Sequence, residues 1–295
     1  MAAAVDRAVA YVFRHGRPVD AAELAFHLGQ GTADVVMHLL GAYRNLDGGF
    51  GHGLEPDVRS PASSVLATTV ALQRMVRVRV DPKHPMVRTA MGFLAGQMDP
   101  ETTNWPLVTA EVRESACAPW WRGYNASEWG ELNPRAEVLS YFVRFGGGGG
   151  GVFDEARRLV LSRLAKETAL DMHELQCVAR LLRTPGIDGT VERTCREALE
   201  RDLPKVLPRS AEQCAGYVLK PLTVARRPNS VLAGLVESSV EVQHGYEVAT
   251  QRRDGAWDVP WNWNEPDSQD WRAAEREWRS HLTMLTASSL HAYGR

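Results

Sequence analysis

The sequence has few cysteines and no long apolar run. Its four cysteines, Cys117, Cys177, Cys195 and Cys214, form no Cys-x-x-Cys pair. This spacing argues against both a disulfide framework and a cysteine-rich zinc site, and favours buried thiols. No window approaches the about 20 apolar residues that a membrane-spanning helix needs, and charged residues interrupt the N-terminal segment where a signal peptide would be apolar. We therefore expect a cytoplasmic protein without a membrane span.

The sequence also lacks an excess of charge of either sign. Its 34 basic and 36 acidic residues give a formal net charge of −2, and neither sign forms a long run. Without a basic patch in the sequence, nucleic acid is not an expected partner. A length of 295 residues with 44% hydrophobic content is enough for a sizeable core, in one large domain or two small ones.

Strand patterns are missing as well, since no useful stretch alternates polar and apolar residues. Apolar residues instead recur at three- and four-residue spacing, which predicts helices and an all-α fold, with Asp20 and Thr32 as N-caps. The predicted helices are Ala3–Phe13, Asp20–Leu28, Ala33–Tyr43, Ser60–Val78, His84–Met98, Pro134–Phe145, Phe153–Thr168, Met172–Leu182, Val191–Leu203, Ala211–Val224, Ser230–Thr250 and Gln269–Tyr293. Pro61 should lie in the first turn of its helix, where its missing N–H costs nothing.

Glycine is concentrated in one segment between two predicted helices, Asn45–Ser60. The segment holds four glycines, three acidic residues, His52 and Arg59. Glycines allow tight turns through positive φ, and Pro56 stiffens the part that presents Glu55 and Asp57. Loops held in this way often carry function. The alternative is a plain helix–helix turn with a surface ion pair.

Three helix ends share a pattern, which indicates internal repeats. An aspartate follows each helix, Asp47, Asp99 and Asp254, with an aromatic residue shortly after it. These aspartates lie 52 and 155 residues apart, which fits a helical hairpin repeated about every 50 residues. The length then accommodates between five and six units. We expect one domain over 1–295, a closed ring of about six inner and six outer helices, with an irregular aromatic insertion around 100–130 and a glycine-rich connector at 146–151.

The last copy, Gln251-Arg252-Arg253-Asp254-Gly255-Ala256-Trp257, resembles the repeat signature of the terpene cyclase and protein prenyltransferase superfamily, including squalene-hopene cyclase-like repeats. Arg44 replaces the glutamine in the first copy, and Pro100 replaces the glycine in the second. The resemblance implies an α/α toroid over nearly the whole chain, in which the signature is a structural joint.

The resemblance does not extend to the superfamily's known chemical motifs. The Asp-x-Asp-Asp motif of protonating triterpene cyclases is absent, and so is an Asp-Asp-x-x-Asp diphosphate motif. The zinc ligands of prenyltransferase β subunits do not assemble either, so we expect neither a metal nor a cofactor. His52, Asp57, His173 and His281 leave a different metal site open.

A toroid would bring several candidate site residues to one central cavity. Glu55-Pro56-Asp57 recurs as Glu265-Pro266-Asp267, and both should lie on one rim, near the N-terminal turns of the inner helices. The predicted catalytic residues are Asp57, Glu55, His52 and Arg59, the last two orienting the acids or holding a polar end of the substrate. The predicted substrate-binding residues are Trp261, Trp263, Trp120, Trp121, Asn133, Glu137, His173, Glu265 and His281.

Three functions fit this arrangement. The preferred one is a terpene-cyclase-like enzyme, in which Asp57 or Glu55 protonates a small apolar, polyunsaturated substrate and tryptophans stabilise the cations. The second is a carbohydrate-active enzyme, a hydrolase, lyase or epimerase, with Glu55 and either Glu265 or Glu137 as acid and base. The third is a non-catalytic module that binds a hydrophobic ligand and uses the acids only to satisfy helix ends.

Overall fold

The computed structural model of the protein describes residues 1–126, 130–146, 150–265 and 268–294. Trp129, part of the glycine-rich connector and the Pro266-Asp267 pair of the second motif lie outside these residues. The longer helices are α1 (Ala2–His15), α2 (Pro18–His27), α3 (Ala33–Leu40), α4 (Val65–Arg77), α5 (Pro85–Gly96), α8 (Arg135–Phe145), α9 (Gly151–Leu164), α10 (Met172–Leu182), α11 (Gly189–Val206), α14 (Ala233–Thr250) and α15 (Gln269–Tyr293). Single-turn elements are η1 (Gly41–Tyr43), α6 (Ala110–Glu114), α7 (Pro119–Arg122), α12 (Ala211–Cys214) and α13 (Pro221–Val224).

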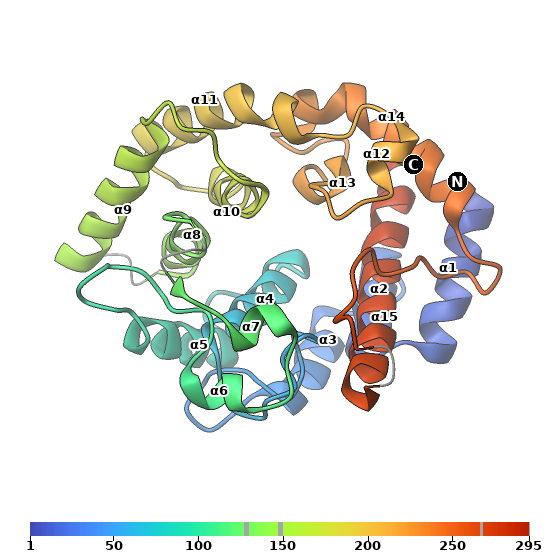
Figure 1. Cartoon of the computed structure of the whole chain (residues 1–295), viewed down its shortest axis with the longest axis horizontal. Coiled ribbons are helices and arrows are strands. Elements are labelled where there is room, and N and C mark those ends of the chain that lie inside the picture. The colour runs from blue at the N-terminus through green and yellow to red at the C-terminus, as the bar shows by residue number, and fades with distance from the viewer. Residues whose placement is uncertain (127–129, 147–149, 266–267, 295) are drawn as a thin grey trace.

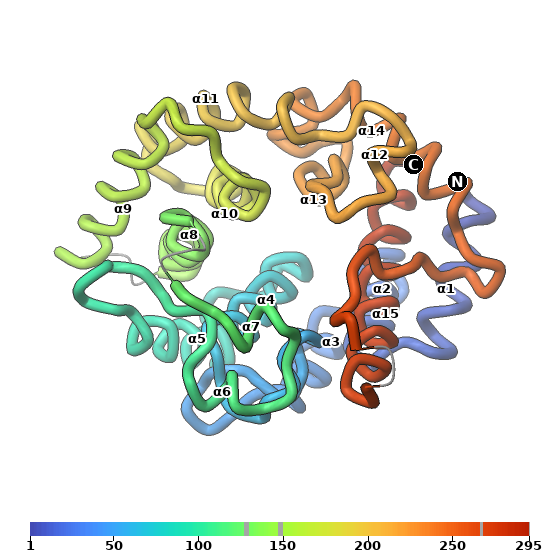
Figure 2. The backbone as a smooth tube through the Cα atoms, viewed as in Figure 1, coloured from blue at the N-terminus to red at the C-terminus, as the bar shows by residue number. Residues whose placement is uncertain are grey.

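The helices form a closed ring around a central space (Figures 1 and 2). The chain alternates between an outer layer, which holds α1, α5, α9, α11 and α14, and an inner layer, which holds α4, α8, α10, α13 and α15. Helix α1 packs against α15, so the two ends of the chain close the ring. The all-α toroid predicted from the sequence is thereby confirmed. Of the helices described, none combines the length and apolar character needed to cross a membrane.

Two helix predictions differ most from the structure. The helix expected at Ser60 begins at Val65, because the Ser64 hydroxyl accepts the Ala67 N–H at 3.0 Å and caps it, while Pro61 stays in the preceding loop. The helix expected over 211–224 is broken into α12 and α13. Pro221 starts α13, since its ring cannot continue a helix from the preceding residues.

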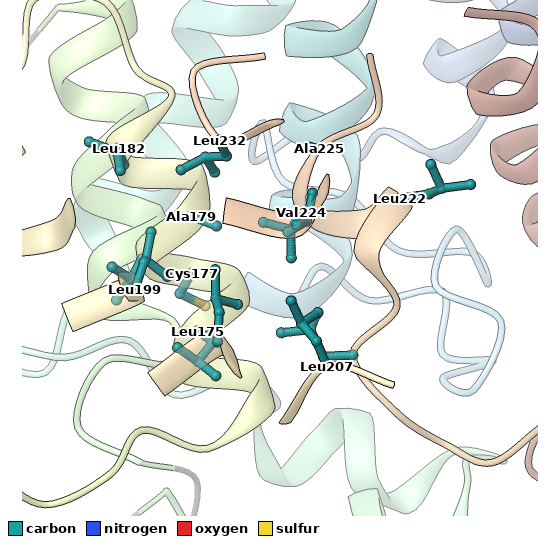
Figure 3. Close-up of a cluster of buried hydrophobic side chains, with 14 of the residues drawn as sticks. Leu175, Cys177, Ala179, Leu182, Leu199, Leu207, Leu222, Val224, Ala225 and Leu232 are labelled. Carbon is teal, nitrogen blue, oxygen red and sulfur yellow. The ribbon is translucent and has the colours of Figure 1, made fainter. Parts of the chain in front are cut away.

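The core lies between the two layers of helices. Figure 3 shows one part of it, where Leu175 and Cys177 of α10 lie beside Leu199 of α11, and Val224 of α13 belongs to the same cluster. All four cysteines are buried and unbridged, as their spacing predicts. The short helix α13 is held by packing against α14 and α10 rather than by its own length, since a single turn is unstable in isolation.

The repeated motif joins the end of an outer helix to the next part of the ring. The Trp257 indole donates to the carbonyl of Glu247 in α14 at 2.8 Å, and the Trp105 indole donates to the carbonyl of Leu94 in α5 at 2.7 Å. Gln251 donates to the carbonyl of Ala4 in α1 at 2.8 Å. The two indole bonds satisfy carbonyls in the last turns of α14 and α5, whereas the Gln251 bond ties the joint to the first turn of α1. These contacts support a structural role for Trp257 as a joint between helices, which is the role that the family resemblance implies.

Asp20 lies where α2, α4 and α15 meet, inside the first turn of α2 rather than at its N-cap. Its buried carboxylate accepts hydrogen bonds from Arg17 at 2.8 Å, Arg74 at 2.6 Å and Ser280 at 2.7 Å. Burial acts to raise the pKa of Asp20, but Arg17 and Arg74 outweigh it and hold the pKa well below its usual range. Arg74 also donates to Glu23 at 2.7 Å. The network ties both ends of the chain to α4.

We expect Asp20→Asn to destabilise the protein by about 3–5 kcal/mol, because it leaves the buried Arg17 and Arg74 without their shared counter-charge. Urea unfolding followed by circular dichroism at neutral pH measures the change. Glu155→Gln, at an exposed carboxylate paired with Arg158, is the matched control and should leave the midpoint unchanged. Equal stability of Asp20→Asn and the unsubstituted protein would show that the network does not hold the ring closed.

Candidate active site

A cavity of about 400 Å³ lies at the centre of the ring, within the usual range for small-molecule sites. Side chains of α4, α8, α10, α13 and α15 line it, together with the loop before α4 and the segments around α7 and Trp261. Most of the residues predicted for the site reach its wall: Glu55, Asp57, Trp120, Trp121, Asn133, Glu137, His173, Trp261 and His281.

The loop that carries the two acids is held from both sides. Its backbone pairs with the aromatic insertion, since Ala118 N–H donates to the carbonyl of Asp57 at 2.8 Å. On the other side, the Arg17 guanidinium donates to the carbonyl of Leu54 at 3.0 Å. Gly51 must lack a side chain, because a Cβ there would lie 2.3 Å from the carbonyl oxygen of Ala62. These constraints fix the direction of the acids.

Glu55 is a buried carboxyl with little compensation for its charge. It is 5% exposed, and within the described residues its Oε2 atom has no hydrogen-bond partner. Burial raises the pKa of Glu55 well above its usual value, and the negative charge of Asp57 raises it further. Backbone N–H groups and Arg17 oppose the shift only in part. Glu55 is therefore a carboxyl that holds its proton well above the pH at which an exposed glutamate loses it.

Asp57 is equally buried but faces indole N–H groups. Burial raises the pKa of Asp57 to about 6, while its hydrogen bond with Trp263, and weaker interactions with Trp278 and Trp261, act to lower it. Trp263 Nε1 donates to Asp57 Oδ1 at 2.8 Å. Both acids therefore have raised pKa values, but their different surroundings make the two carboxyls chemically distinct.

Aromatic rings form the wall next to the acids. The Trp261 ring packs edge-on against Trp278, with 5.0 Å between centroids, and against Tyr217, at 5.5 Å. Tyr217 in turn lies 6.0 Å from the ring of His173. Trp278 and Tyr217 are not among the residues predicted for the site. For Trp278 a signal existed, because it lies three residues before His281 on one helix and so shares its face.

The wall formed by α8 and α10 is polar, and its charged side chains pair with one another. Glu137 accepts hydrogen bonds from Arg180 at 2.8 Å and from Gln73 at 2.9 Å, and Tyr141 also donates to it. Cys177 is buried beside the same carboxylate. The Glu137 carboxyl is thus held in a hydrogen-bond network. This distinguishes it from Glu55, whose carboxylate has few partners.

The structure keeps four of the predicted site residues off the cavity wall. His52 is exposed and its ring pairs with Asn45 at 2.9 Å, because its backbone φ of 55° turns it outward. Arg59 forms a bidentate pair with Glu277 at 2.7 and 3.0 Å. Trp263 lies behind Asp57 in the core, and Glu265 pairs with Arg122 on the surface.

His281 reaches the wall but belongs to the buried network of Asp20. Its Nδ1 atom accepts a hydrogen bond from Arg74 at 2.8 Å. Burial lowers the pKa of His281 to about 3, and the charge of Arg74 contributes. The ring is therefore neutral at physiological pH and cannot serve as an acid there. Within the residues that the structure describes, no group of three or more histidine, cysteine, aspartate or glutamate side chains is arranged to hold a metal ion.

In sequence, the chain matches neither a family model nor a curated protein. In structure, it is similar to two variants of the type II terpene cyclase MstE from Scytonema, each in complex with its substrate geranylgeranyl dihydroxybenzoate. The TM-scores are 0.53 and 0.52, with 13% and 11% identity, and each match covers 98% of this chain and 97% of the other. This similarity establishes the fold as the α/α toroid of type II terpene cyclases, which the joint motif predicts.

Replacing Trp263 with phenylalanine should raise the pKa of Asp57 from about 6 to about 7, because the lost indole N–H stabilises the charged carboxylate. A carbon-13 NMR titration of protein labelled at the aspartate carboxyls measures this pKa. Trp120→Phe is the control, since Trp120 lines the same cavity without a hydrogen bond to Asp57. An unchanged titration of Asp57 in Trp263→Phe would contradict the assigned role of the indole.

Proposed function

We propose that the protein is a terpene-cyclase-like enzyme that promotes acid-assisted cyclisation or isomerisation of a small apolar, polyunsaturated substrate. The observation that carries the proposal is the pair of buried acids, Glu55 and Asp57, on the wall of a cavity that also presents Trp261 and Trp278. The toroid fold shared with type II terpene cyclases supports it. Glu55 does interact with the backbone N–H groups of Asp57 and Val58, but both acids lie on the cavity wall, whereas a module that used them only to satisfy helix ends would place them away from the cavity.

The acids supply the proton that starts such a reaction. One carboxyl O–H bond breaks, and its proton forms a new C–H bond with one carbon of a substrate double bond, which leaves a cation on the other carbon. Electrons of a second double bond can then close a ring. When the last cation loses a proton, the enzyme is restored and the product is an isomer of the substrate. No cofactor is required by this balance.

The aromatic wall stabilises the cationic intermediates. Indole faces attract cations by roughly 0.5–2 kcal/mol each, and more strongly when water is excluded. Trp261, Trp278, Trp120 and Trp121 line the cavity on the side of the acids. A cation formed next to the acids would therefore lie among aromatic rings.

The carbohydrate hypothesis has less support from the geometry. It requires a second carboxyl on the cavity wall, opposite Glu55. Glu265 pairs with Arg122 outside the cavity, and Glu137 is occupied by Arg180 and Gln73. The geometry therefore favours a reaction that needs only the Glu55–Asp57 pair.

We expect Asp57→Asn and Glu55→Gln each to lower kcat/KM by at least about 100-fold, the usual contribution of a positioned general acid. Both substitutions keep the side-chain shape and remove the proton that the reaction requires. Purified protein is incubated with a panel of linear polyenes of different chain length, and products are identified by gas chromatography with mass spectrometry.

Glu265→Gln is the matched control for these variants, because Glu265 is an exposed carboxylate outside the cavity. It should retain full activity. Equal turnover in all three variants would remove the acids from the mechanism. Polyene binding without turnover by the unsubstituted protein would favour the non-catalytic module instead.

Activity should fall as pH rises, because the protonated pair is the active form. Burial raises the pKa of Asp57 to about 6, so kcat/KM should be level below this pH and decline by about tenfold per pH unit above it. Initial rates from pH 4.5 to 8.5, at about one-unit steps and constant ionic strength, test this dependence. An activity that increases over the same range would indicate that the pair acts as a base.

A further inference from the structure

Three tryptophan side chains interact with the carboxyl of Asp57, but only one of them forms a hydrogen bond with it. Trp263 Nε1 donates to Asp57 Oδ1 at 2.8 Å. The indoles of Trp261 and Trp278 approach the same carboxyl, and both side chains line the cavity. Within the described residues, however, the Nε1 atoms of Trp261 and Trp278 are buried and have no hydrogen-bond partner. The wall beside the acids therefore holds two unused donors.

These unused N–H groups oppose folding. A buried donor without an acceptor has lost its hydrogen bonds to water and gains nothing in return, so native proteins rarely keep one without a reason. The rings themselves are well packed, since Trp261 and Trp278 meet edge-on with 5.0 Å between their centroids. Phenylalanine would supply aromatic surface at either position without a polar atom. Packing therefore accounts for the rings but not for their N–H groups.

The acceptor that these donors approach changes its strength during the proposed reaction. A protonated carboxyl is a neutral acceptor, whereas a carboxylate has about four lone-pair positions and forms hydrogen bonds that are shorter and roughly twice as strong. The Trp263 indole occupies one of these positions on Asp57. Others remain for Trp261 and Trp278, and water competes little for them because Asp57 is only 3% exposed.

Charged side chains do not supply this stabilisation. Glu55 in the same loop and Tyr217 in the segment before α13 are the titratable groups that interact with Asp57, and neither carries a positive charge. On the other elements around the cavity, burial lowers the pKa values of His173 in α10 and His281 in α15, so neither ring is a cation near neutral pH. The interactions that lower the pKa of Asp57 all come from indoles.

We infer that Trp261 and Trp278 complete a set of three indole donors that holds the Asp57 carboxylate once its proton has moved to the substrate. This role rests on the proposed function, because it assigns the proton transfer to Asp57. In that step the O–H bond of the carboxyl breaks, the proton forms a C–H bond, and the electron pair of the broken bond stays on the carboxylate. The two indoles are thus positioning residues that act through the acid, in addition to the ring surface that they give to the cavity.

Donors that bind the carboxylate more tightly than the carboxyl favour the transfer of its proton. Interactions accelerate a reaction only when they strengthen on the way to the transition state. Donors already placed in a site that excludes water add this stabilisation with little rearrangement. The same N–H groups occupy lone pairs of Asp57, so its carboxylate becomes a weaker base and a weaker nucleophile towards the neighbouring cation. Asp57 can thus release its proton without recapturing it at once.

The indole signals in a proton–nitrogen-15 NMR spectrum test this donor set without any substrate. From about pH 4.5 to 8.5, the Nε1–H protons of Trp261 and Trp278 should shift downfield, because a hydrogen bond to a carboxylate deshields them. The midpoint should coincide with the pKa of Asp57, about 6. Asp57→Asn should abolish this pH dependence, since the amide gains no charge. Glu55→Gln should retain it, which separates the two acids.

Trp261→Phe and Trp278→Phe keep an aromatic ring on the wall and remove the N–H. Each should raise the pKa of Asp57 from about 6 to between about 6.5 and 7, as measured by the carbon-13 titration of the aspartate carboxyls. Trp120→Phe is the matched control, because Trp120 lines the same cavity without an interaction with Asp57. Benzothienylalanine in place of either tryptophan has sulfur instead of the N–H and nearly the same shape. It should raise the pKa as phenylalanine does, which excludes a change in packing as the cause.

Indole signals of Trp261 and Trp278 that do not change with pH, or that still change in Asp57→Asn, would overturn the inference. An Asp57 pKa that is the same in both phenylalanine variants as in the unsubstituted protein would also overturn it. These failures differ from failure of the proposed function. Titrating indoles in a protein that converts no polyene would contradict the reaction but not the donor set, whereas silent indoles in a protein that converts polyenes would remove the donor set alone.

Discussion

The structure depends on the buried carboxylate of Asp20. It accepts hydrogen bonds from Arg17, Arg74 and Ser280, and so it connects α2, α4 and α15 at the place where the ends of the chain meet. Burial of these charges is costly unless each is paired, so the three helices are held in one arrangement. Arg17 also donates to the carbonyl of Leu54. Closure of the ring and placement of the acidic loop therefore share one network.

Buried carboxyls with and without cationic partners have opposite pKa shifts in this structure. Asp20 and Glu55 are both buried carboxyls, but guanidinium groups hold the pKa of Asp20 low, whereas burial and the charge of Asp57 raise the pKa of Glu55. The difference follows from the number and charge of their partners rather than from depth alone. A scaffold with strongly paired charges around the cavity can thus support two weakly compensated acids within it.

Charge is distributed along the axis of the ring. The acids Glu55 and Asp57 lie before α4 with aromatic rings beside them, and arginines including Arg183 and Arg226 lie at the far end. The inner helices share a direction, so their carbonyl ends face the arginines and their N–H ends lie towards the acids. This polarity gives the cavity two chemically different ends, and an elongated ligand would bind in one orientation.

By itself the sequence determined the class of fold and the central loop. Helical periodicity and the joint around Trp257 are local patterns, and a joint repeated at regular spacing leads to a ring. The glycine-rich loop likewise predicted Glu55 and Asp57 as candidate site residues, and both line the cavity. Only the tertiary structure decided that His52 turns outward and that Trp263 lies behind Asp57. Only the tertiary structure also brings Arg77 and Arg226 together at one end of the ring, because residues from the ends of several helices meet only when the ring closes. The net charge, which is near zero, does not show where basic residues collect.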